Sequence, residues 1–352
     1  ATLLYKIATS LGYKAGLIGT VENIIAGEKV PTPDNIPQTT PDPIYLNKLL
    51  SQMVDKGCEY VFMEVSSHAL DQSRVAGIHF TGGIFTNLTH DHLDYHKNLE
   101  NYFGAKKKFF KMLPPGAFAL SNIDDEYGLR MLEGIKARKF SYGFKNKADF
   151  SEKLETSLLG SFNEYNALAV YASAVLLGFD KEKIKESLKN VDPPRGRFEH
   201  FTAPNGVLVI VDYAHSPDAL EKILVAVNEI KKEGGRIISL FGCGGDKDPF
   251  KRPIMGRIGA TLSDIAIFTS DNPRSEDPSK IIEEMKKGLS DEDLKKVKTI
   301  PNRREAIIEA VKLAKEGDII LAAGKGHETY QEIKGERSHF DDMEEFKKAY
   351  AN

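Results

Sequence analysis

The stretch THDHLDYH, residues 89–96, places three histidines and two aspartates directly after the apolar, β-type run IFTNL. Imidazole and carboxylate groups commonly bind metal ions and transfer protons. Parallel sheets bind their ligands beyond the carboxyl ends of their strands, which is where this cluster falls. The pattern therefore indicates a metal or phosphate site. A helix cap or a hydrogen-bonded turn is the structural alternative, and the spacing does not identify which histidine is the ligand.

A second carboxylate ends another predicted strand. In VFMEVSSHAL, Glu64 closes an apolar run and is followed by Ser66, Ser67 and His68. A carboxylate in this position is well placed to hold Mg²⁺. Equally, Ser66 or Ser67 could simply cap the helix that follows. The pattern leaves both interpretations open.

The helix predicted next, LENYFGAKKKFFKML, carries a lysine on its aromatic stripe. Lys106 lies three or four residues from aromatic side chains on either side, whereas Lys107 and Lys108 are expected to be solvated. Aromatic surroundings disfavour a charged amine, and a neutral amine can add carbon dioxide to form a carbamate. A carbamate is anionic and can bind Mg²⁺. The pattern alone favours the alternative, a lysine whose stem is buried and whose ammonium reaches solvent.

Alternating strand and helix patterns position these residues, and they predict an α/β fold with largely parallel sheets. The second half reads as a doubly wound domain. Its four apolar strands run into the turns DYAH, GCGGDKD, SDNPR and GKGHE, which should line one edge of a sheet. The segment VDPPRGRFEH, 191–200, is the predicted boundary. We therefore expect one domain over 1–197 and another over 198–352.

Composition limits the classes of function. The 352 residues carry a formal net charge of −3, which gives no general attraction to nucleic acid or an acidic membrane. No apolar run is long enough for a transmembrane segment. Cys58 and Cys243 match no metal-binding spacing, which favours a reduced, cytoplasmic setting. We expect a monomer.

Two places look interrupted. The chain begins inside an amphipathic helix pattern, and no phosphate loop of the form GxxxxGK[ST] occurs in it. The expected place for such a loop is immediately before Ala1. Between Phe150 and Ser151, a strand pattern passes to a helical region with almost no connection, which suggests a missing segment.

The chain resembles the Mur ligases, ATP-dependent amide-forming enzymes of peptidoglycan synthesis, and most closely the MurE type that adds the third amino acid. The resemblance rests on TTPDP, MEVSSHALDQSRVAG, TNLTHDHLDYH, YFGAKKKFF, SFNEYNALA, GRFEH, VDYAHSPDAL, GCGGDKD, KRPIMG, DNPR and GKGHE, in this order. It implies a central ATPase domain with a parallel sheet and a C-terminal Rossmann-like domain. The UDP-sugar domain and the phosphate loop of the family are absent from this chain.

The resemblance also implies roles for individual residues. Glu64, His92 and a carbamylated Lys106 would be the catalytic residues and would hold two Mg²⁺ ions, and His90 and His96 would be structural or would support the metal ligands. The other implied sets are Thr39, Thr40, Ser66, Gln72 and Arg74 for the UDP-muramoyl dipeptide; Asn163, Arg197 and Asp212 for ATP; and Lys247, Asp271, Asn272, Pro273, Arg274, Gly324 and Glu328 for the incoming amino acid. Lys247 stands where the family commonly has arginine, so this contact would lose a bidentate fork.

The implied reaction joins meso-diaminopimelate to UDP-N-acetylmuramoyl-L-alanyl-D-glutamate through an acyl phosphate, with ATP as substrate. Arg274 favours diaminopimelate over L-lysine, because a guanidinium offers paired donors to the additional carboxylate. An L-lysine-adding enzyme, a folylpolyglutamate synthetase-like ligase and a non-catalytic protein on a degraded ligase fold are the alternatives.

Overall fold

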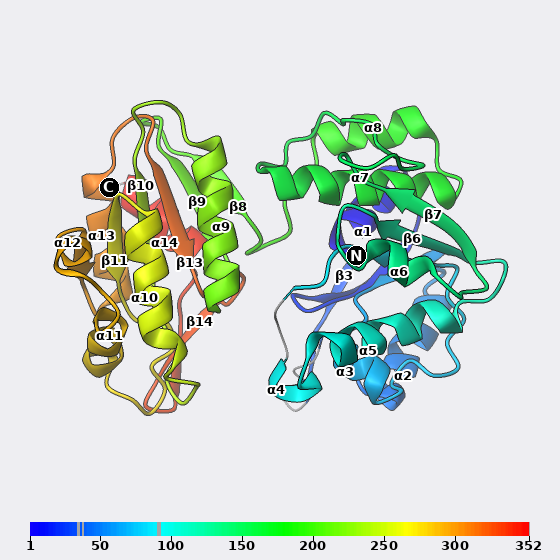
Figure 1. Cartoon of the computed structure of the whole chain (residues 1–352), viewed down its shortest axis with the longest axis horizontal. Coiled ribbons are helices and arrows are strands. Elements are labelled where there is room, and N and C mark those ends of the chain that lie inside the picture. Colours follow the sequence, from blue (N-terminus) through cyan, green and yellow to red (C-terminus); the bar gives the residue numbers. More distant parts are fainter. Residues whose placement is uncertain (34–35, 37–38, 90–92, 352) are drawn as a thin grey trace. The chain divides into compact units, whose positions relative to one another are not determined.

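The computed structural model describes residues 1–33, 36, 39–89 and 93–351, which form two compact units (Figure 1). Unit 1 comprises residues 1–158 and 162–192, and unit 2 comprises 159–161 and 193–352. The main division falls between Asp192 and Pro193, within the Pro-Pro segment 191–200. Strands and helices alternate in both units, which confirms the predicted α/β class.

Unit 1 contains two sheets. One has the order β3-β2-β1-β4, in which β1 and β4 are parallel, and the other is a parallel sheet in the order β5-β6-β7. Ile18 is paired with Met63, so β1 and β4 end at the same edge of their sheet. The strands are β1 (Ala15–Ile18), β2 (Asn23–Ile25), β3 (Glu28–Val30), β4 (Tyr60–Met63), β5 (Gly82–Phe85), β6 (Phe118–Asn122) and β7 (Arg138–Tyr142).

Helices cover both faces of these sheets, because neighbouring strand residues point to opposite sides. Leu17 and Leu120 pack into one core, whereas Ile18 and Ala119 pack into the other. Figure 1 shows α1, α7 and α8 on one side and α2, α3 and α5 on the other. The helices are α1 (Thr2–Ser10), α2 (Pro43–Asp55), α3 (Ser67–Asp71), α4 (Leu93–His96), α5 (Leu99–Met112), α6 (Gly128–Leu132), α7 (Ser161–Leu176) and α8 (Lys181–Lys189).

Unit 2 contains one six-stranded sheet in the order β12-β11-β10-β13-β9-β8, which is parallel except for the β8–β9 pair. This is the doubly wound arrangement predicted from the sequence. A separate hairpin joins β14 to β15. The strands are β8 (Glu199–Thr202), β9 (Leu208–Asp212), β10 (Ile237–Phe241), β11 (Ile265–Phe268), β12 (Val297–Thr299), β13 (Ile319–Ala323), β14 (Tyr330–Ile333) and β15 (Glu336–His339).

Two hydrophobic cores enclose this sheet. One contains residues of α9, α10 and α11, and the other contains residues of α13 and α14. Arg303 is fully buried, pairs with Asp342, and donates to the carbonyls of Ser270 and Ala323 at the ends of two strands. The helices are α9 (Pro217–Ile230), α10 (Lys251–Leu262), α11 (Pro278–Lys286), α12 (Asp291–Leu294), α13 (Arg303–Leu313) and α14 (Asp342–Ala351).

The region around residue 150 differs from the sequence-based expectation. Phe150 forms an isolated β-bridge with Tyr142, and the helix expected soon after it, α7, begins only at Ser161. A missing segment between Phe150 and Ser151 remains a prediction. None of the helices within the described ranges is both long and apolar enough to cross a membrane.

A carboxylate holds three elements of unit 1 together. Asp124, just after β6, accepts hydrogen bonds from the backbone N–H groups of Phe144, Lys145 and Asn146, at 2.6, 2.8 and 2.9 Å, and from the Tyr165 hydroxyl at 2.9 Å. Burial raises the pKa of Asp124, but these hydrogen bonds outweigh it and lower the pKa to about 2.

We expect Asp124→Asn to lower the free energy of unfolding by about 2 kcal/mol at pH 7. The pKa of Asp124 in the folded protein lies below its unfolded value of 3.8. The difference in free energy of unfolding between wild type and Asp124→Asn is therefore fully present above pH 3.8. It should shrink as the pH falls through about 2. Urea unfolding at pH 7, 4 and 3 measures the difference, with the exposed Asp55→Asn as control. Equal stability of Asp124→Asn and wild type at pH 7 would contradict this role.

Candidate active site

The edge of unit 1 where β1 and β4 end carries Glu64 and Thr20. The Thr20 hydroxyl donates to Glu64 Oε2 at 2.6 Å, and its oxygen lies 3.0 Å from the Thr39 hydroxyl. A side chain at Gly19 would place its Cβ 3.2 Å from Glu64 Oε1, so glycine leaves that face of the carboxylate open. Sequence reasoning missed Thr20, although its position two residues after β1, which pairs with β4, is the signal that could have indicated it.

These groups suit a magnesium ion. Carboxylate and hydroxyl oxygens are hard donors of the kind that Mg²⁺ prefers, and Glu64, Thr20 and Thr39 present them together. Within residues 1–33, 36, 39–89 and 93–351, no group of three His, Cys, Asp or Glu side chains could hold a metal. The predicted ligand His92 lies outside the described residues, as does His90.

The residues expected to contact the UDP-muramoyl dipeptide lie beside Glu64. Thr40 is fully buried, and its hydroxyl donates to Glu64 O and accepts from Ser66 N–H, both at 2.9 Å. Its side chain therefore fixes the chain after β4. Arg74 donates to Thr40 O at 2.9 Å and, through Nε, to Gln72 Oε1 at 2.9 Å. The fold thus brings Thr40, Ser66, Gln72 and Arg74 together.

Ser66 has the capping role that the sequence left open. Its side chain accepts from Ala69 N–H at 3.2 Å and caps α3. A capping hydroxyl accepts with one lone pair, so this bond does not conflict with a substrate contact. The predicted substrate contact of Ser66 remains a prediction.

Lys106 lies on the aromatic face of α5, as expected. It is half-buried, and its Nζ lies 5.0 Å from the ring centroid of Tyr102. Tyr102 is buried and stacks on His96, with ring centroids 5.1 Å apart. His96 is buried, and its Nε2 lies 2.9 Å from the Ser67 hydroxyl. His96 therefore has a structural role, and it connects α5 to the helix that follows Glu64.

The expectation that Lys107 and Lys108 are solvated is wrong for Lys107. Only 7% of Lys107 is exposed, and its ammonium donates to Arg130 O and, at 2.8 Å, to Met131 O. These carbonyls lie in the last turn of α6, where helices leave acceptors without intrahelical partners. Burial lowers the pKa of Lys107. Lys108 is exposed and pairs with Asp71 at 2.7 Å.

The residues expected to contact ATP occur in both units. Asn163 is buried in α7 of unit 1, where its Oδ1 accepts from Asn166 at 3.0 Å. Asp212 ends β9 in unit 2 and accepts from the backbone N–H groups of Phe198 and Ala214, both at 2.8 Å. Burial raises the pKa of Asp212, against the effect of those bonds. Arg197 is exposed, and its guanidinium lies 4.9 Å from the Tyr213 ring centroid.

Three predicted loops meet at the carboxyl edge of the unit 2 sheet. They follow β10, β11 and β13, which are neighbours in that sheet. Arg274 donates through Nη1 to Gly245 O at 2.7 Å, and Gly245 N–H donates to Asn272 O at 2.9 Å. Lys247 is exposed. A Cβ added at Gly244 would lie 3.6 Å from Lys247 Cγ and 3.0 Å from Arg274 Nη1, so both side chains pass close to this glycine.

The third loop completes this cluster. Asp271, Asn272, Pro273 and Gly324 are buried, and Glu328 is half-buried. A Cβ at Gly324 would lie 2.6 Å from Asp271 Oδ2, and the glycine has φ +110°, so no other residue fits there without a shift. Asn272 donates to Glu328 Oε2 at 2.8 Å. The predicted amino-acid residues thus lie on loops at one edge of the sheet, and these loops carry both cationic and anionic side chains.

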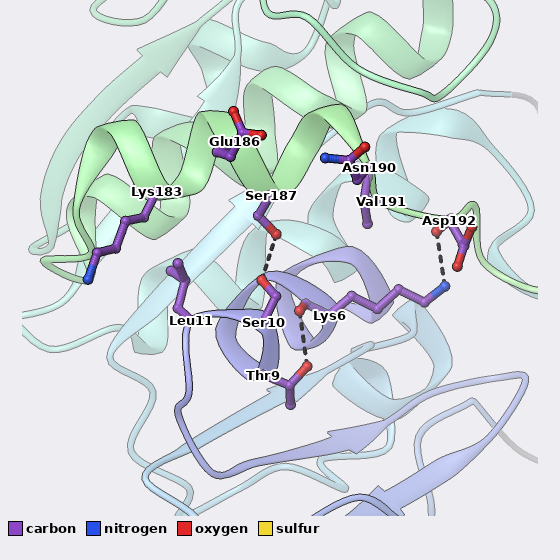
Figure 2. Close-up of a pocket in the computed structure, with 10 residues that line it drawn as sticks. All are labelled: Lys6, Thr9, Ser10, Leu11, Lys183, Glu186, Ser187, Asn190, Val191 and Asp192. Atoms are coloured by element: carbon purple, nitrogen blue, oxygen red, sulfur yellow. Dashed lines mark hydrogen bonds between the residues drawn. The ribbon is translucent and has the colours of Figure 1, made fainter.

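A polar groove elsewhere in unit 1 contains none of the predicted site residues. It lies between α1 and α8, where Ser10 and Ser187 are joined by a 2.6 Å hydrogen bond (Figure 2). Lys6 donates to Asp192 O at 2.9 Å in the same groove. Its hydroxyl and oppositely charged groups form no catalytic or metal-binding arrangement, so we place the candidate active site at the strand edges.

Comparison with known proteins identifies the family. Residues 1–174 match the Mur ligase middle domain, and residues 196–326 match the Mur ligase glutamate ligase domain. The chain belongs to the Mur ligase family. The two matched regions correspond closely to the two compact units of this Mur ligase.

Two relatives that are 43–50% identical to this chain carry the same name. A Parabacteroides distasonis protein named UDP-N-acetylmuramoyl-L-alanyl-D-glutamate–2,6-diaminopimelate ligase is 50% identical, over 100% of this chain and 75% of its own length. A Clostridium perfringens protein of the same name is 43% identical, over 98% of this chain and 74% of its own. The first alignment extends over 368 residues, against the 352 of this Mur ligase.

Solved structures with a similar fold include a ligase with the same name as these relatives. The structure of a UDP-N-acetylmuramoyl-L-alanyl-D-glutamate–2,6-diaminopimelate ligase is 32% identical, with a TM-score of 0.69, over 99% of this chain and 75% of its own. E. coli FolC in complex with DHPP and ADP has a TM-score of 0.65 at 18% identity, over 92% of this chain and 81% of its own. At that identity, the likeness to FolC shows a shared fold alone.

Proposed function

We propose that this Mur ligase adds meso-diaminopimelate to UDP-N-acetylmuramoyl-L-alanyl-D-glutamate in an ATP-dependent step of peptidoglycan precursor synthesis. The observation that carries the proposal is the cluster of Arg274, Asn272 and Glu328 at the edge of the unit 2 sheet. A guanidinium suits the carboxylate of diaminopimelate, and Glu328 suits its ammonium. The named activity of relatives 43–50% identical along the whole chain supports it.

The chemistry has two steps. A carboxylate oxygen of the D-glutamate side chain attacks the γ-phosphorus of ATP, the bond to the ADP oxygen breaks, and an acyl phosphate forms. The neutral amine of diaminopimelate then attacks the carbonyl carbon, phosphate leaves, and the nitrogen loses a proton to give the amide. The chain contributes mainly by positioning these groups and by balancing their charge.

The proposal assigns roles by position. Glu64, His92 and Lys106 as its carbamate would hold two Mg²⁺ ions, which neutralise and align phosphate oxygens when bound. Thr20 and Gly19 keep one oxygen of Glu64 anchored and the other open. The UDP-muramoyl dipeptide would bind beside Glu64, at Thr39, Thr40, Ser66, Gln72 and Arg74. ATP would bind at Asn163, Arg197 and Asp212, and the amino acid at Lys247, Asp271, Asn272, Pro273, Arg274, Gly324 and Glu328.

The remaining substrates and setting follow from the same proposal. The partners are small molecules, the carbon dioxide enters only as the Lys106 carbamate, and the protein acts as a cytoplasmic monomer. Arg274 favours diaminopimelate over L-lysine. FolC shares the fold but no observation here favours a folate substrate.

The decisive assay is ligation by the full-length protein with UDP-N-acetylmuramoyl-L-alanyl-D-glutamate, ATP and Mg²⁺. We expect mass spectrometry to detect the UDP-muramoyl tripeptide with meso-diaminopimelate, and at least about tenfold less product with L-lysine. Equal or greater turnover of L-lysine would overturn the diaminopimelate assignment. Absence of ATP-dependent ligation with every amino acid would favour a non-catalytic binding protein.

A further inference from the structure

Lys325 is a fully buried lysine at the edge of the proposed amino-acid site. It follows β13, and none of its side chain is exposed. Its Nζ lies 3.2 Å from Asn272 Oδ1 and 3.1 Å from Glu328 Oε2, and 5.6 Å from the ring centroid of Tyr330. A buried ammonium is costly unless such partners surround it. The fold therefore retains this charge at a specific place.

The network around Lys325 fixes the orientation of Asn272. Asn272 Oδ1 accepts from Lys325 and, at 3.0 Å, from the backbone N–H of Glu332. Because two donors face this atom, it is the amide oxygen, and the amide nitrogen faces Glu328. Asn272 Nδ2 accordingly donates to Glu328 Oε2 at 2.8 Å. Lys325 and Asn272 thus hold the same carboxylate oxygen.

In this arrangement, Oε2 of Glu328 accepts two hydrogen bonds, and Oε1 is available to a ligand. Both donors reach Oε2, and no other residue in the described part of the chain donates to Oε1. The Glu328 side chain is 18% exposed, whereas the side chain of Lys325 is inaccessible. A carboxylate oxygen presented in this way suits a cation from solution, such as a primary ammonium.

We propose that Lys325 is a positioning residue that determines amino-acid specificity, by holding Glu328 so that Oε1 receives the non-reacting ammonium of the incoming amino acid. The inference rests on the proposed function. The amine that attacks the acyl phosphate must be neutral to have a free electron pair, so an ammonium paired with Glu328 belongs to the other amino group. Lys325 acts only through Glu328 and Asn272 and does not touch the substrate.

The test compares Lys325→Met with wild type in the full-length protein. We expect the KM for meso-diaminopimelate to rise about 10–100-fold, as for residues that orient a ligand group. The KM values for ATP and for the UDP-muramoyl dipeptide should stay within about twofold. Lys280→Met removes an exposed lysine of the same unit and is the matched control. Lys325→Gln, which retains a hydrogen-bond donor, provides the same measurements if the methionine variant does not fold.

Two further measurements separate positioning from a structural role. With 2-aminopimelate, which lacks the second amino group, wild type and Lys325→Met should show similar kcat/KM. In a double-mutant cycle, Lys325→Met should add little to the KM effect of Glu328→Gln, because both changes remove the same interaction. Multiplicative effects in that cycle, or equal losses with 2-aminopimelate and diaminopimelate, would overturn the proposal. An unchanged KM in Lys325→Met with active wild type refutes this inference alone, whereas inactive wild type refutes the proposed function.

Discussion

Lys106→Ala is expected to slow ligation by about 10²–10³-fold, while the thermal midpoint of unfolding stays close to that of wild type. The proposed carbamate of Lys106 supplies an anionic oxygen beside the phosphates, and alanine cannot replace it. The fold does not depend on this side chain, because the core contacts of α5 come from Phe103, Phe109 and Phe110. Lys106 itself is only half-buried beside Tyr102.

Three measurements check this prediction. Ligation rates and thermal unfolding are compared for wild type, Lys106→Ala and Lys111→Ala, an exposed lysine of the same helix that serves as control. Independently of activity, ¹³C-bicarbonate should give a carbamate resonance by NMR in wild type and in Lys111→Ala but not in Lys106→Ala. Full activity of Lys106→Ala, or no carbamate resonance in wild type, would contradict the role assigned to Lys106.

Arg274→Ala should reduce kcat/KM for meso-diaminopimelate by tens of fold, because a buried charge-assisted contact contributes on the order of 2–3 kcal/mol. Arg274 has φ 50°, a conformation that is rare for a residue with a side chain. Hydrogen bonds to β14 and to the residue after it hold Arg274 there, since its N–H donates to Glu332 O at 3.0 Å and its carbonyl accepts from Lys334 N–H at 2.6 Å. The surrounding fold thus maintains the strain and aims the guanidinium.

Substrate choice distinguishes this effect from general damage. L-Lysine lacks the second carboxylate, so Arg274→Ala should change kcat/KM for L-lysine by less than about threefold. Arg274→Lys keeps the charge but loses the paired donors, and it should give an intermediate loss with diaminopimelate. Arg257→Ala removes an exposed arginine of the same unit and is the control. If Arg274→Ala lowers kcat/KM equally for both amino acids, Arg274 does not recognise the second carboxylate.

The parallel-sheet architecture and the location of the motifs could be predicted from the sequence. Apolar runs such as those before Glu64 and Arg274 are local patterns, and the residue that follows a buried strand lies at the carboxyl edge of its sheet. The α/β class and the doubly wound sheet were predicted for the same reason and are confirmed. His92, which the resemblance singled out, lies outside the described residues.

The sequence by itself determined which residue types stand at the strand ends and which family the chain resembles. Tertiary structure decided which of them meet, because contacts such as Thr20 with Glu64, or Lys325 with Asn272, join residues 44 and 53 positions apart. It also decided that Lys107 is buried, since its carbonyl partners belong to α6 and no pattern within α5 reveals them. Local periodicity gives the face of a helix, whereas the partner on that face depends on how separate elements pack.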